Sequence, residues 1–181
     1  VEKVLPVFSP LLSYELELSA EDLPGSRRTV VCAIPTAAAA VHLASGGTAV
    51  GGGWVRPCSY TSITSPFGNR TSPTAGASSY HQGVDLDTGT GDPVYASRAG
   101  VVTVAGWGNA AGNYVQINHQ DGFSSIYMHL SSYCVSAGQI VSAGQLIGAT
   151  GATGITTGDH LHFGISYNGV YVNPCNYVAL Y

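Results

Sequence analysis

From Trp54 to the C-terminus, the chain consists of short runs of β-type residues separated by glycine-containing turns. The readable runs are Pro93–Ala96, Gly100–Val104, Asn113–Ile117, Phe123–Leu130 and His160–Ser166. The pair Asn168-Gly169, between two further β-type runs, predicts a hairpin with a type I′ turn. Glycine is abundant at 24 residues, and we find no long amphipathic helical pattern. The pattern predicts an all-β fold.

Residues 1–53 differ in character from the rest of the chain. They hold acidic residues, an Arg27-Arg28 pair and the run Ala37–Ala40, and they end in a glycine-rich stretch over 46–53. We therefore expect a boundary here. Residues 1–53 are predicted to be an N-terminal extension, either a pro-region or the remainder of an upstream domain, with a Gly-rich linker, and residues 54–181 to be the main domain.

Charge and hydropathy exclude two classes of partner. The net charge is −4 and only 9% of residues are charged, so no basic stripe is present to follow a phosphate backbone. The apolar runs are broken well below the roughly 20 residues that a membrane-spanning helix requires. We expect a soluble monomer that binds no nucleic acid and does not span a membrane.

The four cysteines, Cys32, Cys58, Cys134 and Cys175, have no C-x-x-C spacing, which argues against a zinc ribbon or a thioredoxin-type motif. An even number allows two disulfides and an extracellular compartment, with the connectivity left open. Four buried thiols are the alternative. Cys58 and Cys175 lie near the two ends of the main domain, so this pair is the first to test.

Two segments carry candidate metal ligands. His160 and His162 are one residue apart in a strand-like run, so the period of two places both on one face. His81 and Asp85 flank Gly83, which favours a loop entering a strand over a helix. A catalytic zinc usually takes three protein ligands and leaves a position for water. His81, Asp85 and one histidine of the pair supply that number, and the other histidine, with His129, is left to act on the reaction.

A repeated segment suggests an alternative class of protein, a carrier-type β-sandwich. Val135–Ile140 is echoed by Val141–Leu146, and the echo resembles the turn of a lipoyl- or biotinyl-type carrier sandwich. A carrier would need a lysine at a hairpin tip, and no lysine follows Lys3. The carrier function is therefore disfavoured. His119, before a predicted hairpin turn, is expected to be structural.

The order and spacing of these motifs resemble the LytM- or lysostaphin-type zinc metallopeptidases of family M23, which cut peptidoglycan peptides. The resemblance covers about residues 54–181. The matching segments are Ile63–Arg70, His81-Gln82-Gly83-Val84-Asp85, Tyr127–Leu130, Val141–Gly148, His160-Leu161-His162-Phe163 and Val172-Asn173-Pro174.

The resemblance implies an antiparallel β-sheet domain with a narrow groove walled by loops. It also implies that one zinc ion per chain is bound by His81, Asp85 and His162. His129 and His160 would be the catalytic histidines. Asn113 and Tyr114 follow Gly112 where the groove wall of the family would lie, and they are candidate substrate-binding residues.

The function implied is zinc-dependent hydrolysis of peptide crosslinks or stem peptides in bacterial peptidoglycan, by an enzyme that is secreted or held in the cell envelope. A crosslink between stem peptides is the expected bond. The alternative is a catalytically inactive LytM-like module that binds or regulates at the cell wall. Such modules typically lose metal ligands, and none of the five residues is missing here.

Overall fold

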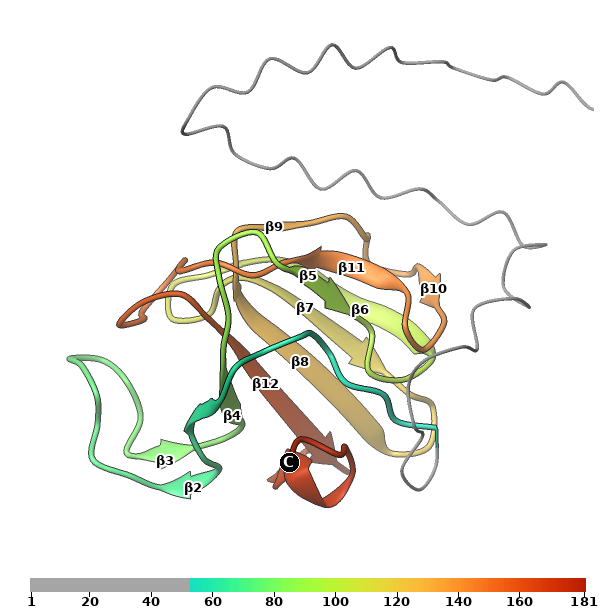
Figure 1. The fold of residues 1–181 in the computed structure, drawn as a ribbon. Helices are drawn as coiled ribbons and strands as arrows, with labels where there is room; N and C mark the ends of the chain where they lie inside the picture. Colours follow the sequence, from blue (N-terminus) through green and yellow to red (C-terminus); the bar gives the residue numbers. More distant parts are fainter. Residues whose placement is uncertain (1–52) are drawn as a thin grey trace, which may run out of the picture.

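The computed structural model describes residues 53–181, and this part of the chain is built almost wholly from antiparallel β-strands (Figure 1). The strands are β1 (Ile63–Ser65), β2 (Gly68–Asn69), β3 (Tyr80–His81), β4 (Val84–Asp87), β5 (Pro93–Tyr95), β6 (Gly100–Gly108), β7 (Gly112–Asn118), β8 (Phe123–Leu130), β9 (Ser132–Tyr133), β10 (Ile140–Val141), β11 (Leu146–Ala149), β12 (His160–Tyr167) and β13 (Val170–Val172). A 3-10 turn, η1 (Pro174–Asn176), follows them. The all-β prediction is confirmed, while the extension expected over residues 1–53 lies outside the described residues except for Gly53.

The strands form one large sheet and two small ones. The large sheet has the order β1-β4-β12-β8-β7-β6-β10, and β13 also pairs with β12. The order β5-β11-β9 makes a second, three-stranded sheet, and β2 pairs with β3 alone. In Figure 1 the β2–β3 hairpin projects from the side of the large sheet beside β4. No helix in residues 53–181 is long and apolar enough to cross a membrane.

The hairpin predicted at Asn168-Gly169 is present. Tyr167 pairs with Val170 across the turn, which places β12 against β13. Asn168 has a φ of 50° and Gly169 a φ of 82°, as a type I′ turn requires at both central positions. The expected strands all occur, with β6 running on to Gly108, past the predicted end at Val104.

The sequence repeat folds into two copies of one turn. In the first copy Gln139 N donates to Ser136 O at 3.0 Å, and in the second Gln145 N donates to Ser142 O at 3.1 Å. The middle glycine has a positive φ in each copy, 87° at Gly138 and 76° at the second glycine. The repeat therefore provides the two turns that connect β9 to β10 and β10 to β11.

The hydrophobic core lies on one face of the large sheet. Along β12, Leu161, Phe163 and Ile165 are fully buried and belong to this core. The second sheet contributes Val94 from β5 and Ile147 from β11 to the same cluster. Because strand side chains alternate, His160 and His162 project from the opposite face of β12. Packing of one face thus leaves the other face available for a site.

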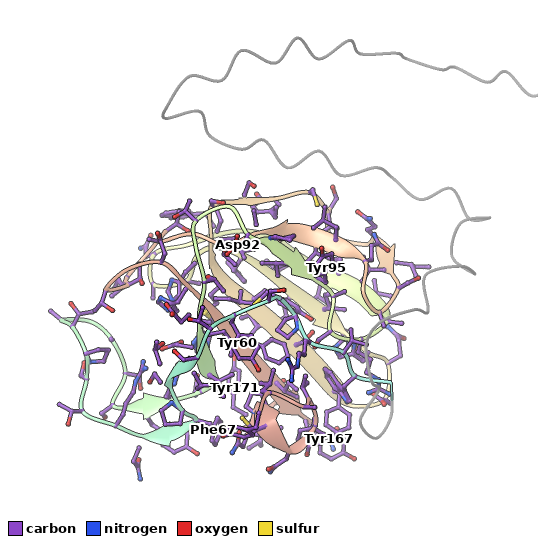
Figure 2. All side chains as sticks on the ribbon, viewed as in Figure 1. Tyr60, Phe67, Asp92, Tyr95, Tyr167 and Tyr171 are labelled. Carbon is purple, nitrogen blue, oxygen red and sulfur yellow. The ribbon has the colours of Figure 1, made fainter. Side chains whose placement is uncertain are left out.

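The two ends of the described chain are fastened to each other. Arg56 Nε donates to Ala179 O at 2.7 Å, and the Tyr60 hydroxyl donates to Leu180 O at 2.6 Å. Tyr60 is labelled in Figure 2. These bonds tie the segment before β1 to the segment after η1.

Cys58 and Cys175 are free thiols in the structure, so the pair named as the first to test is not disulfide-bonded. Both side chains contribute to the apolar core instead, Cys58 as a buried residue and Cys175 as a partly buried one. Burial raises the pKa of the Cys58 thiol to about 12, which keeps it protonated. Cys134 is disulfide-bonded, and Cys32 lies outside the described residues.

A chain of buried polar groups crosses the sheet at the end away from His160 and His162. His119 Nδ1 donates to Ala99 O at 2.8 Å, and its Nε2 lies 2.9 Å from Ser125 Oγ. Ser125 Oγ lies 2.9 Å from the Tyr127 hydroxyl, which accepts from Ser97 N at 2.7 Å. With His119 neutral, Nε2 accepts from Ser125 and Tyr127 donates to Ser125, so every group has a partner. The structural role expected of His119 agrees with these contacts.

We expect His119 to make stability fall in acid. Protonating His119 would turn both ring nitrogens into donors and leave the buried Tyr127 proton without an acceptor. Burial also lowers the pKa of His119 below its ordinary value of 6.5. The unfolded chain then binds more protons, so stability is full above about pH 6.5 and falls as the pH drops towards the folded pKa. The stability advantage of wild type over His119→Gln, from urea denaturation, should shrink between pH 7.5 and pH 5. A pH-independent difference would contradict this role.

Candidate metal centre

Three strands bring His81, Asp85 and His162 together. His81 ends β3, Asp85 is in β4, and His162 of β12 lies directly opposite Asp85 in the antiparallel register. His162 Nδ1 is 2.9 Å from Asp85 Oδ1 and 2.9 Å from His81 Nε2, which is itself 3.1 Å from Asp85 Oδ1. All three residues are buried. These three atoms form a compact triangle of potential metal ligands, which is called the donor triangle below.

This donor set fits a zinc ion. Two imidazole nitrogens and a carboxylate oxygen are ligands that zinc takes in catalytic sites. Tetrahedral bonds of about 2.1 Å would separate the ligand atoms by roughly 3.4 Å, so the triangle needs to open by only a few tenths of an ångström. The cluster is the only group of three such residues found within residues 53–181.

Backbone groups set the orientation of His81 and make room for His162. His81 Nδ1 donates to Pro66 O at 2.9 Å, which turns Nε2 towards the triangle. A Cβ atom at Gly83 would lie 2.7 Å from His162 Nε2 and 2.6 Å from Phe163 O. Glycine at this position therefore allows the His162 ring to stand where it does.

Arg70 holds the outer oxygen of Asp85. Its Nη1 donates to Asp85 Oδ2 at 3.0 Å and to Ser65 Oγ at 2.5 Å. Burial alone would raise the pKa of Asp85, but hydrogen bonds from His162 and His81 outweigh that effect and keep the pKa well below its usual range. Asp85 is thus a carboxylate with one oxygen turned to Arg70 and the other to the histidines.

A β-bulge in β8 directs His129 to the same place. Leu130 pairs with Asn113 and Tyr127 with Val115, so β8 has one residue more than β7 across this interval. His129 takes up the difference with a φ of 64°. Tyr127 and Leu130 both point into the core, while His129 lines the pocket beside the triangle. Without the bulge, strand alternation would not give this arrangement.

Thr153 fixes the ring of His129. The carbonyl of Thr153 accepts from His129 Nδ1 at 2.8 Å, so Nε2 carries no proton. The hydroxyl of Thr153 donates to Leu130 O at 2.7 Å and accepts from Asn113 N at 3.0 Å. A Cβ at Gly112, whose φ is 65°, would lie 2.3 Å from Thr153 O. The loop before β12 is therefore pressed closely against the β6–β7 turn.

His160 is oriented in the same way. Its Nδ1 donates to Gly158 O at 2.9 Å, and its Nε2 lies 3.6 Å from Asp85 Oδ1. The rings of His160 and His129 have centroids 4.8 Å apart. Burial lowers the pKa of His129 to about 4, so this ring is neutral near neutral pH. The Nε2 atoms of both rings face the space beside the donor triangle.

A groove runs past these residues. One part is lined by Asp85, His129, His160 and His162, with walls from Pro73–Ala77 and Ile155–Thr157. It continues along a second set of residues that includes Ala110, Ala111, Met128, Tyr80 and Tyr171. Tyr171 is labelled in Figure 2. The walls are the loop between β2 and β3, the loop between β11 and β12, and the β6–β7 turn.

The structure brings together the five residues predicted as ligands or catalytic groups, but it does not bring the two predicted substrate-binding residues into the groove lining. Asn113 and Tyr114 are absent from both sets of lining residues. The Asn113 side-chain amide donates to Leu130 O and Ser131 O, each at 3.2 Å. These contacts give Asn113 a structural task, and its substrate role stays a prediction.

Sequence reasoning missed Arg70 and Thr153 as parts of the site. Arg70 was included only within a motif, although it is one of three arginines in residues 53–181, which contain no lysine. Because cationic residues are so few here, an arginine inside a matching motif could have been singled out as a candidate site residue. Thr153 acts mainly through its backbone carbonyl, which no sequence pattern indicates.

The fold and the cluster together define a β-sheet protein with a three-residue cluster that could hold a metal ion in a loop-walled groove. The family model "Peptidase family M23" matches residues 79–174, and the chain belongs to this family. The match covers all five residues of the site.

Relatives and solved structures agree with this membership. The chain is 42% identical over 130 residues, 72% of its length, to the DD-carboxypeptidase/endopeptidase Mpg of Neisseria meningitidis, and 35% identical over 119 residues, 65% of its length, to the peptidoglycan DD-endopeptidase ShyC of Vibrio cholerae. It spans 30% of the first relative and 28% of the second. The catalytic domain of lysostaphin from Staphylococcus simulans matches with a TM-score of 0.59 and 36% identity, covering 64% of this chain and 90% of that one.

We expect Gly83→Ala to weaken metal binding. The added methyl group would press on His162 Nε2 and Phe163 O, and the ring would have to leave its place in the triangle. Mutations that disturb the surroundings holding a metal ligand in place cost about 10- to 100-fold in metal affinity. Zinc competition against a chromophoric chelator measures this.

Gly106→Ala is the matched control, because its nearest atom would be 4.0 Å away in β6. Equal zinc affinity in Gly83→Ala and Gly106→Ala would contradict the packing role of Gly83.

We expect Thr153→Val to disturb His129 while leaving zinc in place. The valine removes the hydroxyl, so Asn113 N loses its partner and Leu130 O keeps only the Asn113 side-chain amide. An unpaired buried group of this kind costs about 1–3 kcal/mol of stability. The loop carbonyl that orients His129 would then shift. Thr153→Ser should restore both stability and turnover, which thermal unfolding, zinc content and kinetics would measure together. Normal turnover in Thr153→Val would rule out this positioning role.

Proposed function

We propose that the chain is a zinc-dependent endopeptidase that hydrolyses peptide crosslinks or stem peptides of bacterial peptidoglycan. The observation that carries this proposal is the donor triangle of His81, Asp85 and His162 at the floor of a groove, with His129 and His160 facing it. The names of the relatives, which include peptidoglycan DD-endopeptidases, support the choice of substrate.

One zinc ion per chain would be held by His81 Nε2, Asp85 Oδ1 and His162 Nδ1. When bound, zinc at three protein ligands supplies Lewis-acid activation of a water molecule and of the scissile carbonyl. One carboxylate among the ligands leaves the site with a net positive charge, because Asp85 offsets only part of the charge of a divalent ion.

The chain's own residues would move the protons. His129 and His160 each donate from Nδ1 to a backbone carbonyl, so in the neutral ring of either residue the free nitrogen is Nε2. One of them can accept the proton of the attacking water, and once protonated a histidine can donate to the leaving amine or to the developing oxyanion. The shared tautomer makes either histidine chemically able to take either role.

The groove would position the substrate. Small side chains, Gly76, Ala77, Ala110 and Ala111, leave room for a peptide backbone with small substituents. A crosslink that ends in D-alanine meets that requirement. This substrate also implies action outside the cell or in its envelope. The proposed catalytic unit is residues 54–181, acting as a monomer.

We expect the two histidines of β12 to fail differently. His162→Ala should lose zinc together with activity, because it removes one of three ligands. His160→Ala should keep about one zinc per chain and lose most turnover, because His160 lies next to the triangle without completing it. Zinc analysis combined with mass spectrometry of muropeptides released from purified peptidoglycan measures both.

Equal zinc retention in the two variants would contradict this division of roles. Wild type that holds zinc but releases no muropeptides would favour the alternative of an inactive wall-binding module. The masses of the released fragments identify the bond that is cut.

A further inference from the structure

Arg70 is placed to do more than support Asp85. It lines both parts of the groove, and its side chain is 18% exposed. Among the groove-lining residues it is the only lysine or arginine, and Asp85 is the only carboxylate. Apart from its histidines, the groove therefore has one permanent cation, located at the metal ligands.

The hydrogen bonds of Arg70 leave one end of its guanidinium unused. Nη1 makes both strong contacts, to Asp85 Oδ2 at 3.0 Å and to Ser65 Oγ at 2.5 Å. Nε has a long contact of 3.4 Å to Ser78 O. Nη2 has no hydrogen bond to any residue in 53–181, although a guanidinium carries five donors arranged to bind oxyanions. Two N–H groups thus stay available at the edge of the metal-binding cluster.

We propose that Arg70 Nη2 binds a substrate carboxylate carried by the carbon atom that bears the leaving nitrogen of the scissile amide. The proposal rests on the proposed function and names a substrate class for it. A carboxylate at that place is adjacent to the scissile bond, and Arg70 is adjacent to the residues that would hold the metal. The contact between Arg70 and this carboxylate would therefore hold the scissile bond next to the metal-binding residues.

Two kinds of D-alanyl amide carry such a carboxylate. In a D-alanyl-D-alanine terminus it is the C-terminal carboxylate. In a crosslink to a diamino acid whose side chain ends in its own amino-carboxylate centre, it is the carboxylate of that centre. An internal glycyl-glycine bond carries an amide there, and Arg70 would give it no charged contact. Charge-assisted hydrogen bonds are the stronger kind, so the difference should be measurable.

The test compares two peptides that differ only at this group. One ends in D-alanyl-D-alanine with a free carboxylate, and the other ends in the carboxamide. Wild type should prefer the carboxylate by about 10- to 100-fold in kcat/KM, the equivalent of one charge-assisted hydrogen bond. Arg70→Gln should lower turnover of the carboxylate peptide and remove most of that preference.

Arg98→Gln is the matched control. Arg98 pairs with Asp121 and lies outside the groove lining, so its variant should keep the wild-type preference. Zinc per chain is measured for every variant, because Arg70 also contacts Asp85. If Arg70→Gln loses zinc, Arg70→Lys is used instead. A lysine paired with Asp85 has no second fork nitrogen, so the preference should still fall.

The outcomes separate this inference from the proposed function. Wild type that cuts neither peptide nor peptidoglycan contradicts the proposed function itself. Wild type that cuts both peptides equally overturns the role of Arg70 and leaves the function standing. Arg70 variants that hold zinc and lose the same factor on both peptides show that Arg70 only positions Asp85, which also overturns the inference.

Discussion

The pairing of β12 with β4 is the constraint on which the site depends. It places His162 opposite Asp85, and through β8 on its other side it places the same histidine opposite Met128. A slip of one residue in either pairing would turn the histidines into the core and bring Leu161 and Phe163 to the surface. Burial of those two side chains therefore fixes the register that assembles the donor triangle. Stability of the core and geometry of the site have one cause.

Period-two patterns allowed much of this to be predicted from the sequence. Alternation placed His160 and His162 on one face, and Asn168-Gly169 specified the hairpin that follows them. His81 and Asp85 were correctly expected in strand and loop rather than helix. Each of these features depends on neighbours in the chain or on a single strand, where local rules are reliable.

Features that depend on two distant segments could not be predicted. The bulge that turns His129 into the groove appears only when β7 and β8 are compared residue by residue. Thr153 matters because its loop meets the turn at Gly112, which is a contact of tertiary structure. Cys58 and Cys175 were the first pair to test from their positions near the domain ends, yet both stay reduced. The positions of residues along the chain did not determine their pairing in space.

Three of the four histidines in the site are oriented by main-chain carbonyls, at Pro66, Thr153 and Gly158. A carbonyl is present whatever side chain a residue carries. The loops that wall the groove can therefore change their side chains, and with them the shape offered to a substrate, while the protons on the imidazoles stay where they are. Substrate range and proton placement can diverge independently in such a protein, which gives evolution a way to alter specificity without rebuilding the chemistry.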